Sequence, residues 1–176
     1  MTIITHNRVR LVPTTVHHLD LEEISGGELA HALGVASPPN WPPEYNDTST
    51  RAWIREALRA NPQDGAWYSW YVVATVEDVD TLAGISGFKG PPGSDGTVEI
   101  GYSIVTALRR RGLATAAVQL LCAQAFAAGA SAVIAETLPD LVASQGVLAK
   151  TGFGRVEIRQ DPEAGEIWRY RGDRPE

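Results

Sequence analysis

Cysteine is nearly absent from this sequence: Cys122 is the single one among 176 residues. An intrachain disulfide framework is therefore excluded, and no CxxC pair or Cys/His cluster has the spacing of a zinc site. No run approaches the roughly 20 apolar residues needed to cross a bilayer. The first residues, Met1–His6, are too short and too polar for a secretory signal. We therefore expect a soluble cytoplasmic protein with no metal and no membrane partner.

An excess of positive charge is also missing. The 15 Lys and Arg residues are outnumbered by 21 Asp and Glu residues, which gives a net charge of −6 at pH 7. Such a surface is not built for nucleic acid, so no nucleic-acid partner is expected, and it weakly favours a cationic acceptor such as an amine. The length predicts a single domain over 1–176, with its core at about 8–171. The oligomeric state stays open, with a homodimer as one option.

The apolar periodicity predicts an α/β (α+β) domain. Strands are expected at 8–12, 67–76, 82–89, 97–105, 132–137, 155–160 and 166–171. Helices are expected at about 15–24, 28–33, 48–60, 113–128 and 142–151. Short links between the early strands predict an antiparallel meander, and the later strand–helix–strand order predicts one parallel crossover. We expect a mixed central sheet of six to seven strands with flanking helices.

Finer expectations concern helix caps, helix faces and the chain end. Thr14 or Thr15 is expected to cap the first helix, and Thr48 or Ser49 the third. The third helix should bury Trp53, Ala57 and Leu58, and the fourth Val118, Leu121, Cys122 and Ala125. Trp67, Tyr68 and Trp70 are expected to pack in a strand, and 172–176 is expected to fray.

The most informative segment is the basic glycine turn Arg109–Ala114, which lies between an apolar strand and a long helix. The first N–H groups of a helix lack intrahelical partners and carry partial positive charge, so such a turn suits a diphosphate. A Walker loop and a GxGxxG fingerprint are both absent. The pattern (Gln/Arg)-x-x-Gly-x-(Gly/Ala) is filled by Arg109, Gly112 and Ala114.

The flanks of this turn carry a family resemblance. Val98-Glu99-Ile100-Gly101-Tyr102-Ser103-Ile104 precedes it, and Ser144-x-x-Val147-Leu148-x-Lys150-x-Gly152-Phe153 follows after the next strand. This arrangement resembles the GNAT superfamily of N-acetyltransferases, in the branch of RimJ and RimL. The resemblance implies the GNAT fold, with acetyl-CoA as co-substrate.

The resemblance also implies where the co-substrate binds. Backbone N–H groups of about 110–115 would hold the pyrophosphate, and 104–106 would pair with the pantetheine arm beside a splayed strand 132–137. The N–H near Val105 would stabilise the oxyanion. The implied cofactor-binding residues are Ile104, Val105, Thr106, Arg109, Arg110, Arg111, Gly112, Leu113, Ala114 and Thr115.

Transfer of acetyl to an amine needs a base, since an ammonium has no lone pair. Glu99 is the candidate base, and Gly101 on the same strand face removes side-chain bulk beside it. The alternative is a glutamate paired with a nearby arginine. Ser144 matches a family serine near the CoA sulfur, where it could donate a hydrogen bond to the thiolate. Alternatively, or in addition, Ser144 caps its helix.

The sequence departs from the family at two positions. Leu148 stands where many members have a tyrosine acid, so that route is not available from this position. Leu141 stands where an asparagine often contacts the CoA arm.

Several other residues are considered for the acceptor or for chemistry. Trp41 and Tyr45 lie on a proline-rich loop, where they either shape the acceptor pocket or pin the loop to the core. Cys122 is expected to be core packing, His17 and His18 do not suggest a metal site, and His31 flanks the loop.

The leading hypothesis is an acetyl-CoA-dependent N-acetyltransferase that acts by direct attack of a primary amine, either a protein N-terminus or a small amine. The alternative is an acyl-CoA-binding sensor or interaction domain without transfer. A third option is a different nucleotide, such as ATP or NAD, at the turn.

Overall fold

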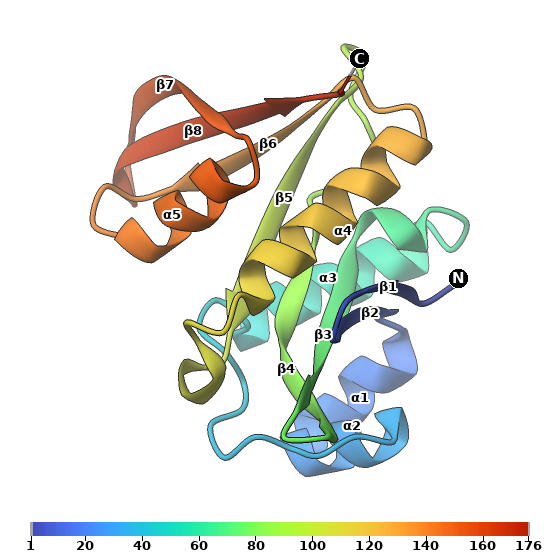
Figure 1. Cartoon of the computed structure of the whole chain (residues 1–176). Helices are drawn as coiled ribbons and strands as arrows, with labels where there is room; N and C mark the ends of the chain where they lie inside the picture. The colour runs from blue at the N-terminus through green and yellow to red at the C-terminus, as the bar shows by residue number, and fades with distance from the viewer. Residues whose placement is uncertain (1, 176) are drawn as a thin grey trace.

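One continuous sheet of eight strands forms the centre of the protein, in the spatial order β1-β2-β3-β4-β5-β6-β8-β7. The computed structural model describes residues 2–175 (Figure 1). The elements in chain order are β1 (Ile4–His6), β2 (Val9–Pro13), α1 (Val16–Ile24), α2 (Gly26–Leu33), α3 (Thr48–Ala60), η1 (Gly65–Trp67), β3 (Ser69–Val76), β4 (Val79–Phe88), β5 (Thr97–Ile104), η2 (Thr106–Leu108), α4 (Leu113–Ala127), β6 (Ala132–Thr137), α5 (Val142–Lys150), β7 (Gly154–Asp161) and β8 (Gly165–Asp173).

The connectivity follows the predicted pattern. Strands β3 to β5 pair antiparallel in chain order, which is the expected meander, and β1 and β2 extend it in the same antiparallel order. Helix α4 then crosses to β6, and within residues 2–175 β5 and β6 are the one parallel strand pair. The hairpin β7–β8 joins this sheet through β8, which pairs with β6.

The eighth strand is β1, which the sequence analysis did not anticipate. It pairs with β2 from Ile4↔Leu11 to His6↔Val9, and the chain reverses at Asn7 with a φ of 53°. Asparagine tolerates this left-handed conformation better than most residues. A strand of three residues is too short to show an alternating pattern, which explains why it was missed.

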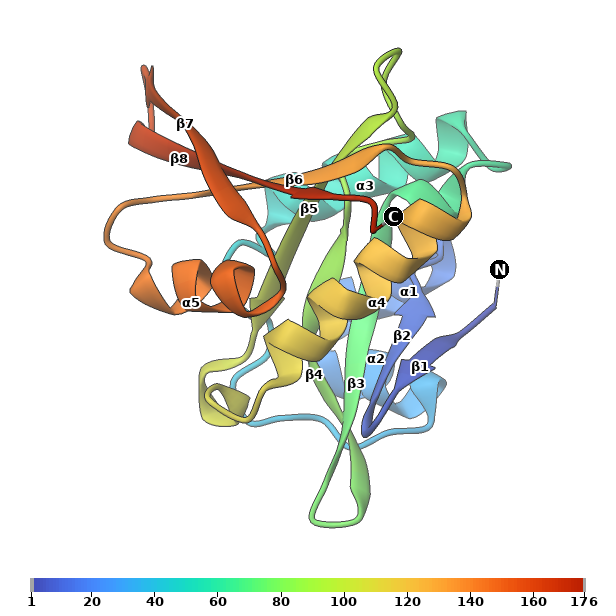
Figure 2. The same cartoon turned by 45° about the horizontal axis from the view of Figure 1, so that its top comes forward.

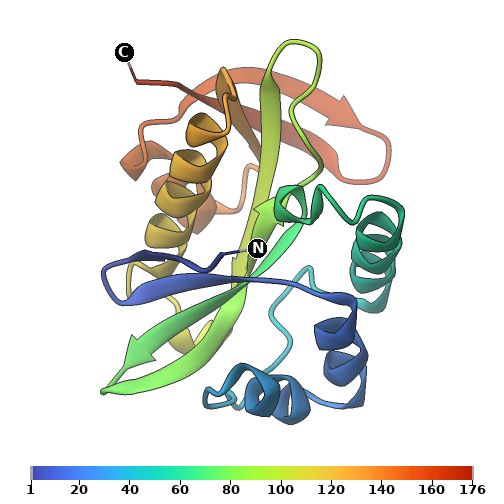
Figure 3. The same cartoon turned by 90° about the vertical axis from the view of Figure 1, so that its right-hand side faces the viewer.

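Helices cover both faces of the sheet (Figure 3). Helices α4 and α5 lie on one face, and α1, α2 and α3 lie on the other. On α4, Val118, Leu121 and Ala125 are fully buried as predicted, and Cys122 is partly buried against the same core. The α4 face of the sheet is the one that adjoins the basic turn.

The caps of the helices partly match expectation. Thr15 caps α1, as predicted, by accepting the His18 N–H. Helix α2 begins two residues earlier than expected, because Ser25 both ends α1 and caps α2. Asp47 caps α3 by accepting the Thr50 N–H at 2.8 Å, so the prediction of Thr48 or Ser49 was wrong. A carboxylate one residue upstream reaches the same N–H groups.

The buried face of α3 also differs from expectation. Ile54 and Leu58 are buried, Ala57 packs beside them, and Trp53 is 46% exposed. The Trp53 ring instead lies edge-on to Tyr68, with 6.1 Å between the ring centroids. A wide aromatic side chain can cover the rim of a core without entering it.

Two further expectations concern the β3 aromatics and the chain end. Trp70 is buried in β3, as predicted for strand packing. Trp67 and Tyr68 lie outside the strand, because η1 ends at Trp67 and β3 begins at Ser69; Trp67 packs edge-on against Phe88, and Tyr68 is buried. The chain does not fray from Gly172, because β8 runs to Asp173 and pairs with β6. A Cβ at Gly172 would come within 3.0 Å of the Phe153 ring, so the glycine lets the strand pack closely there. Residue 176 lies outside the described residues.

Candidate active site

The basic glycine turn connects β5 to α4 through two residues with left-handed backbone. Arg110 has a φ of 62° and Gly112 a φ of 78°. Gly112 is the N-cap of α4, and within residues 2–175 no side chain caps this helix. The N–H groups of the first helical turn therefore remain free to bind an anion.

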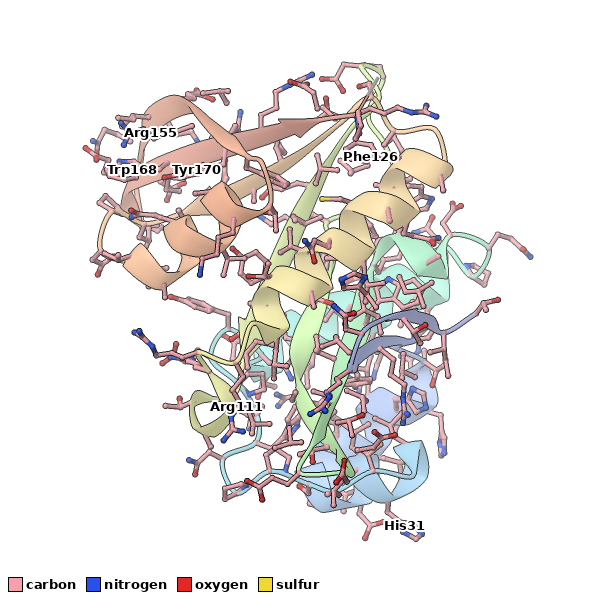
Figure 4. The ribbon with its side chains drawn as sticks, in the orientation of Figure 1. His31, Arg111, Phe126, Arg155, Trp168 and Tyr170 are labelled. Carbon is pink, nitrogen blue, oxygen red and sulfur yellow. The ribbon has the colours of Figure 1, made fainter. Side chains whose placement is uncertain are left out.

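The arginine side chains of the turn have different roles. Arg109 turns back, donating from Nε to the Ile104 carbonyl at 3.0 Å and from Nη2 to Glu44 Oε2 at 2.8 Å. It therefore braces the turn against the end of β5. Arg110 and Arg111 are exposed, and Figure 4 shows Arg111 near η2, below the start of α4. The N–H groups at the start of α4, together with Arg111, are therefore a better candidate anion site than the Arg109 side chain.

A groove of about 730 Å³ adjoins the turn. Its lining includes four of the predicted cofactor-binding residues, Arg111, Gly112, Leu113 and Thr115. Arg8 and Lys150 also line it, so three cations meet there against one carboxylate. The remaining lining residues are Asn7, Val9, Thr75, Val76, Glu77, Ala116 and Gln119. A polyanionic ligand matches this charge pattern.

Beside the turn, β5 and β6 separate. Their ladder runs from Thr97↔Ala132 to Ile100↔Ala135, whereas β5 continues to Ile104. Figures 1 and 2 show the two strands together at one end and diverging toward α4 and α5 at the other. The predicted splay of strand 132–137 is therefore present, and it leaves backbone groups of β5 without a strand partner.

The backbone of β5 presents different groups to this opening than expected. The Val105 N–H donates to the Ala83 carbonyl at 2.9 Å, so it points toward β4 and is not a free oxyanion donor. Backbone groups alternate between the two neighbours of a strand. The N–H groups of Tyr102 and Ile104 therefore face the opening. The sequence could not indicate which edge each N–H would face without the pairing register.

Glu99 lies on the opposite face of β5 from the α4 core. Its side chain is 21% exposed and forms an ion pair with Lys89, the residue that follows β4. A Cβ at Gly101 would meet no atom within 4 Å, so the space beside the carboxylate is open, as predicted. The expected alternative of a paired glutamate is thus found, with a lysine rather than an arginine as partner. Sequence analysis missed Lys89 because it depends on the β4–β5 register.

On the other face of β5, Tyr102 contacts Ser144 of α5. The Tyr102 hydroxyl lies 2.9 Å from Ser144 Oγ and 3.3 Å from its carbonyl oxygen. Burial raises the pKa of Tyr102, and the bond to Ser144 offsets part of that rise. Leu141 is the N-cap of α5, so Ser144 is not a helix cap. Leu148 is fully buried.

The proline-rich loop is pinned to the core by Glu22 of α1. The buried Glu22 carboxylate accepts hydrogen bonds from Trp41 Nε1 at 2.9 Å, Asn46 Nδ2 at 2.6 Å and the Tyr71 hydroxyl at 2.7 Å. Trp41 therefore holds the loop in place, which was one of its two predicted roles. Tyr45, the residue before Asn46 in the same loop, is 63% exposed.

The remaining candidates do not form a second catalytic cluster. Burial raises the pKa of the Cys122 thiol to about 12, which opposes a thiolate nucleophile. His31 lines a separate groove of about 490 Å³ with Asp78 and Asp80, and Figure 4 shows it at the far end from the β7–β8 hairpin. In the part of the chain that the structure describes, no group of three or more His, Cys, Asp or Glu side chains could hold a metal.

Membrane insertion finds no support in the helices. None of those within residues 2–175 is long and apolar enough to span a bilayer.

Comparisons with known proteins agree with this geometry. A family model described as an acetyltransferase (GNAT) domain matches residues 8–154. The uncharacterized N-acetyltransferase YjdG of Bacillus subtilis (strain 168) is 30% identical over 154 residues, which cover 87% of this chain and 90% of that protein.

Two solved structures are similar in fold. The ribosomal-protein-S5-alanine acetyltransferase from Vibrio fischeri has a TM-score of 0.71 at 14% identity, and the match covers 98% of this chain and 97% of that one. RimL, a ribosomal L7/L12 alpha-N-protein acetyltransferase in complex with coenzyme A, has a TM-score of 0.70 at 15% identity and 98% coverage of both chains. At these identities the likeness shows a shared fold.

Proposed function

The chain belongs to the GNAT acetyltransferase family, and on that basis we propose that it transfers an acetyl group from acetyl-CoA to a primary amine. The observation that carries the proposal is the uncapped turn at Gly112, immediately beside the point where β5 and β6 separate. The turn at Gly112 suits a diphosphate, and the opening between β5 and β6 suits an extended arm. A CoA thioester has both parts.

The residues around the turn fit acetyl-CoA as co-substrate. Free N–H groups at the start of α4 would bind the pyrophosphate, and Arg8, Arg111 and Lys150 supply positive charge in the adjoining groove. The open edge of β5 would bind the pantetheine arm. Acetyl-CoA supplies the activated acetyl thioester, and the remaining chemistry falls to side chains of the protein.

Glu99 is the proposed general base. It lies on β5, partly exposed, with open space at Gly101 next to it. A carboxylate there can accept the proton that the acceptor nitrogen must lose before it attacks. The Lys89 ammonium group pairs with this carboxylate. An incoming amine therefore has to displace Lys89 from Glu99.

The proposed acceptor is a protein N-terminus or a small amine. Structures of similar fold include enzymes named for protein acceptors, and a net charge of −6 attracts a cationic amine. The exposed Tyr45, next to the Glu22 anchor, is the proposed aromatic contact to the acceptor. Trp41 would support that contact by fixing the loop.

A family member that binds acyl-CoA without transferring it is the second candidate function. The observation in its favour is Leu141, which replaces the asparagine expected by resemblance and stands at the start of α5. The two candidates predict the same ligand but different products.

The test combines ligand binding with an acceptor panel. Thermal unfolding is measured with acetyl-CoA, CoA, ATP and NAD, and thiol release is then followed with amino acids, polyamines and short peptides, with product masses recorded. We expect acetyl-CoA to stabilise the protein most and at least one amine to gain an acetyl group. Tight acetyl-CoA binding with no acetylated amine would favour the sensor, and stronger stabilisation by ATP or NAD would contradict the CoA assignment.

A further inference from the structure

A row of hydroxyl side chains crosses the sheet where β5 and β6 separate. Tyr102 on β5 is in register with Ser86 on β4. Extending the β5–β6 register by two residues beyond Ile100↔Ala135 brings Thr137 opposite Tyr102, on the far side of the opening. Residues in register share a sheet face, and here it is the face covered by α4 and α5.

Two hydroxyls of this row have no partner. Ser86 and Thr137 are 4% and 5% exposed, and neither hydroxyl forms a hydrogen bond within the residues that the structure describes. Buried hydroxyls are normally paired, and leaving them unpaired destabilises the fold. Thr137, on β6, borders the opening, and its position favours a polar ligand group between β5 and β6, such as an amide or thioester of the CoA arm. Ser86 lies on β4, across β5 from the opening.

The other two hydroxyls of the site bond to each other. The Tyr102 phenol extends from β5 to α5 and lies 2.9 Å from Ser144 Oγ. Either hydroxyl can donate in this pair, and the phenol is also placed to donate to the Ser144 carbonyl at 3.3 Å. In the arrangement in which Tyr102 donates to Ser144 Oγ, the hydrogen of Ser144 is free to point elsewhere. No other side chain among residues 2–175 takes it. Burial keeps the phenol protonated by raising its pKa, so it remains a donor.

We propose that Tyr102 is a positioning residue that orients the Ser144 hydroxyl toward the sulfur of CoA. This inference rests on the proposed function. Leu148 occupies the position of the tyrosine acid of many relatives and is buried, so stabilisation of the thiolate falls to another donor. The Tyr102–Ser144 pair provides one, because Ser144 lies on the same helix one turn before Leu148 and Tyr102 reaches it from β5.

The amine nitrogen bonds to the acetyl carbon, the C–S bond breaks, and its electron pair goes to sulfur. The proton of the amine goes to Glu99 and then to solvent. Ser144 donates a hydrogen bond to the developing thiolate while Tyr102 donates to Ser144. The thiolate takes up a proton from solvent on release.

The direct test is the pH dependence of CoA binding, which needs no acceptor. If the pair stabilises a thiolate, it lowers the pKa of the bound CoA thiol, and the affinity for CoA rises roughly tenfold as pH increases from that pKa to the higher pKa of the free thiol. Acetyl-CoA has no free thiol, so its affinity should not show this rise. The pH dependence of acetyl-CoA binding therefore measures the contribution of all other titrating groups, which is subtracted. We expect Tyr102→Phe and Ser144→Ala each to abolish the rise, and the double variant to match the singles, because the two hydroxyls act as one unit.

Tyr170→Phe is the matched control, since this buried tyrosine lies on β8 in the same core (Figure 4). It should keep the pH-dependent rise. Wild-type-like melting of Tyr102→Phe excludes misfolding, and with an active amine its kcat should fall roughly 10- to 100-fold while KM for acetyl-CoA stays within about twofold.

Retention of the pH-dependent rise by Tyr102→Phe, or its absence from the wild type, would overturn the inference. If the rise is present but no amine is acetylated, thiolate binding by the pair stands and the proposed transfer fails. The two failures are therefore distinguishable.

Discussion

The ammonium group of Lys89 lies against the carboxylate of Glu99. The Lys89 N–H also donates to the Glu99 carbonyl at 2.9 Å, at the open end of the β4–β5 ladder. Lys89 is 57% exposed, so the pair faces solvent on the sheet face opposite α4. A substrate ammonium that approaches Glu99 therefore meets a carboxylate that already has a cationic partner.

Replacement of Lys89 should make Glu99 more accessible to a cationic acceptor. We expect Lys89→Met to lower KM for the amine by up to about fivefold, because an exposed ion pair contributes at most roughly 1 kcal/mol. Lys89→Arg keeps the charge and should stay near wild type. Steady-state kinetics with varied amine measures the change. A higher KM in Lys89→Met would mean that Lys89 assists the acceptor.

Substitution of Gly112 tests the proposed anion site at the turn. A Cβ at Gly112 would meet no atom within 4 Å, but the φ of 78° is a left-handed conformation that strains residues other than glycine. Gly112→Ala should destabilise the protein by about 1 kcal/mol and weaken acetyl-CoA binding, since the strained turn re-aims the N–H groups of α4. Calorimetric titration and denaturant unfolding measure the two effects.

Gly146→Ala is the control for that variant. Gly146 lies inside α5, and a Cβ there meets no atom within 4 Å. Alanine in a helix should raise stability by roughly 0.5–1 kcal/mol without changing acetyl-CoA affinity. Equal loss of affinity in both glycine variants would contradict the role of the turn.

The buried Glu22 carboxylate should stabilise both the fold and the proline-rich loop. Glu22→Leu leaves the Trp41, Asn46 and Tyr71 donors without an acceptor, and we expect a loss of about 2–4 kcal/mol in the free energy of unfolding. Urea unfolding checks this value. Glu23→Leu, which removes only an exposed ion pair with Arg55, should lose less than about 1 kcal/mol.

His18 should make stability depend on pH. Burial, with a smaller contribution from His17, lowers the pKa of His18 below its ordinary value of 6.5. The unfolded chain then binds this proton more readily than the folded one, so stability is full above the unfolded pKa and decreases as pH falls below it. Unfolding measured between about pH 7 and about pH 5 should show a smaller decrease in His18→Gln. An unchanged slope would contradict this assignment, and exposed His6→Gln is the control.

The main architecture was predictable because its signals are local. The Arg109–Ala114 turn is six consecutive residues between a strand and a helix, and the α4 core positions follow a 3.6-residue period. Both were found where expected. The β3 to β6 order followed from short links and one helical crossover.

The partners of the site could not be predicted, because they depend on register between distant elements. Tyr102 and Ser144 are 42 residues apart in the sequence and meet only where α5 packs near β5 in the folded protein. The direction of the Val105 N–H likewise follows from pairing with Ala83. Glu22 was not singled out, since a glutamate on a short helix is usually exposed.

The sharpest test of base catalysis by Glu99 is the pH profile of kcat/KM for Glu99→Gln with an accepted amine. Between about pH 6 and about pH 9, we expect the variant to lose roughly 100-fold or more at the optimum and to approach wild type only where hydroxide takes over proton removal. Glu163→Gln, in the exposed β7–β8 loop, should keep the wild-type profile. A Glu99→Gln profile that coincides with wild type over this whole range would contradict the assignment of Glu99 as the base.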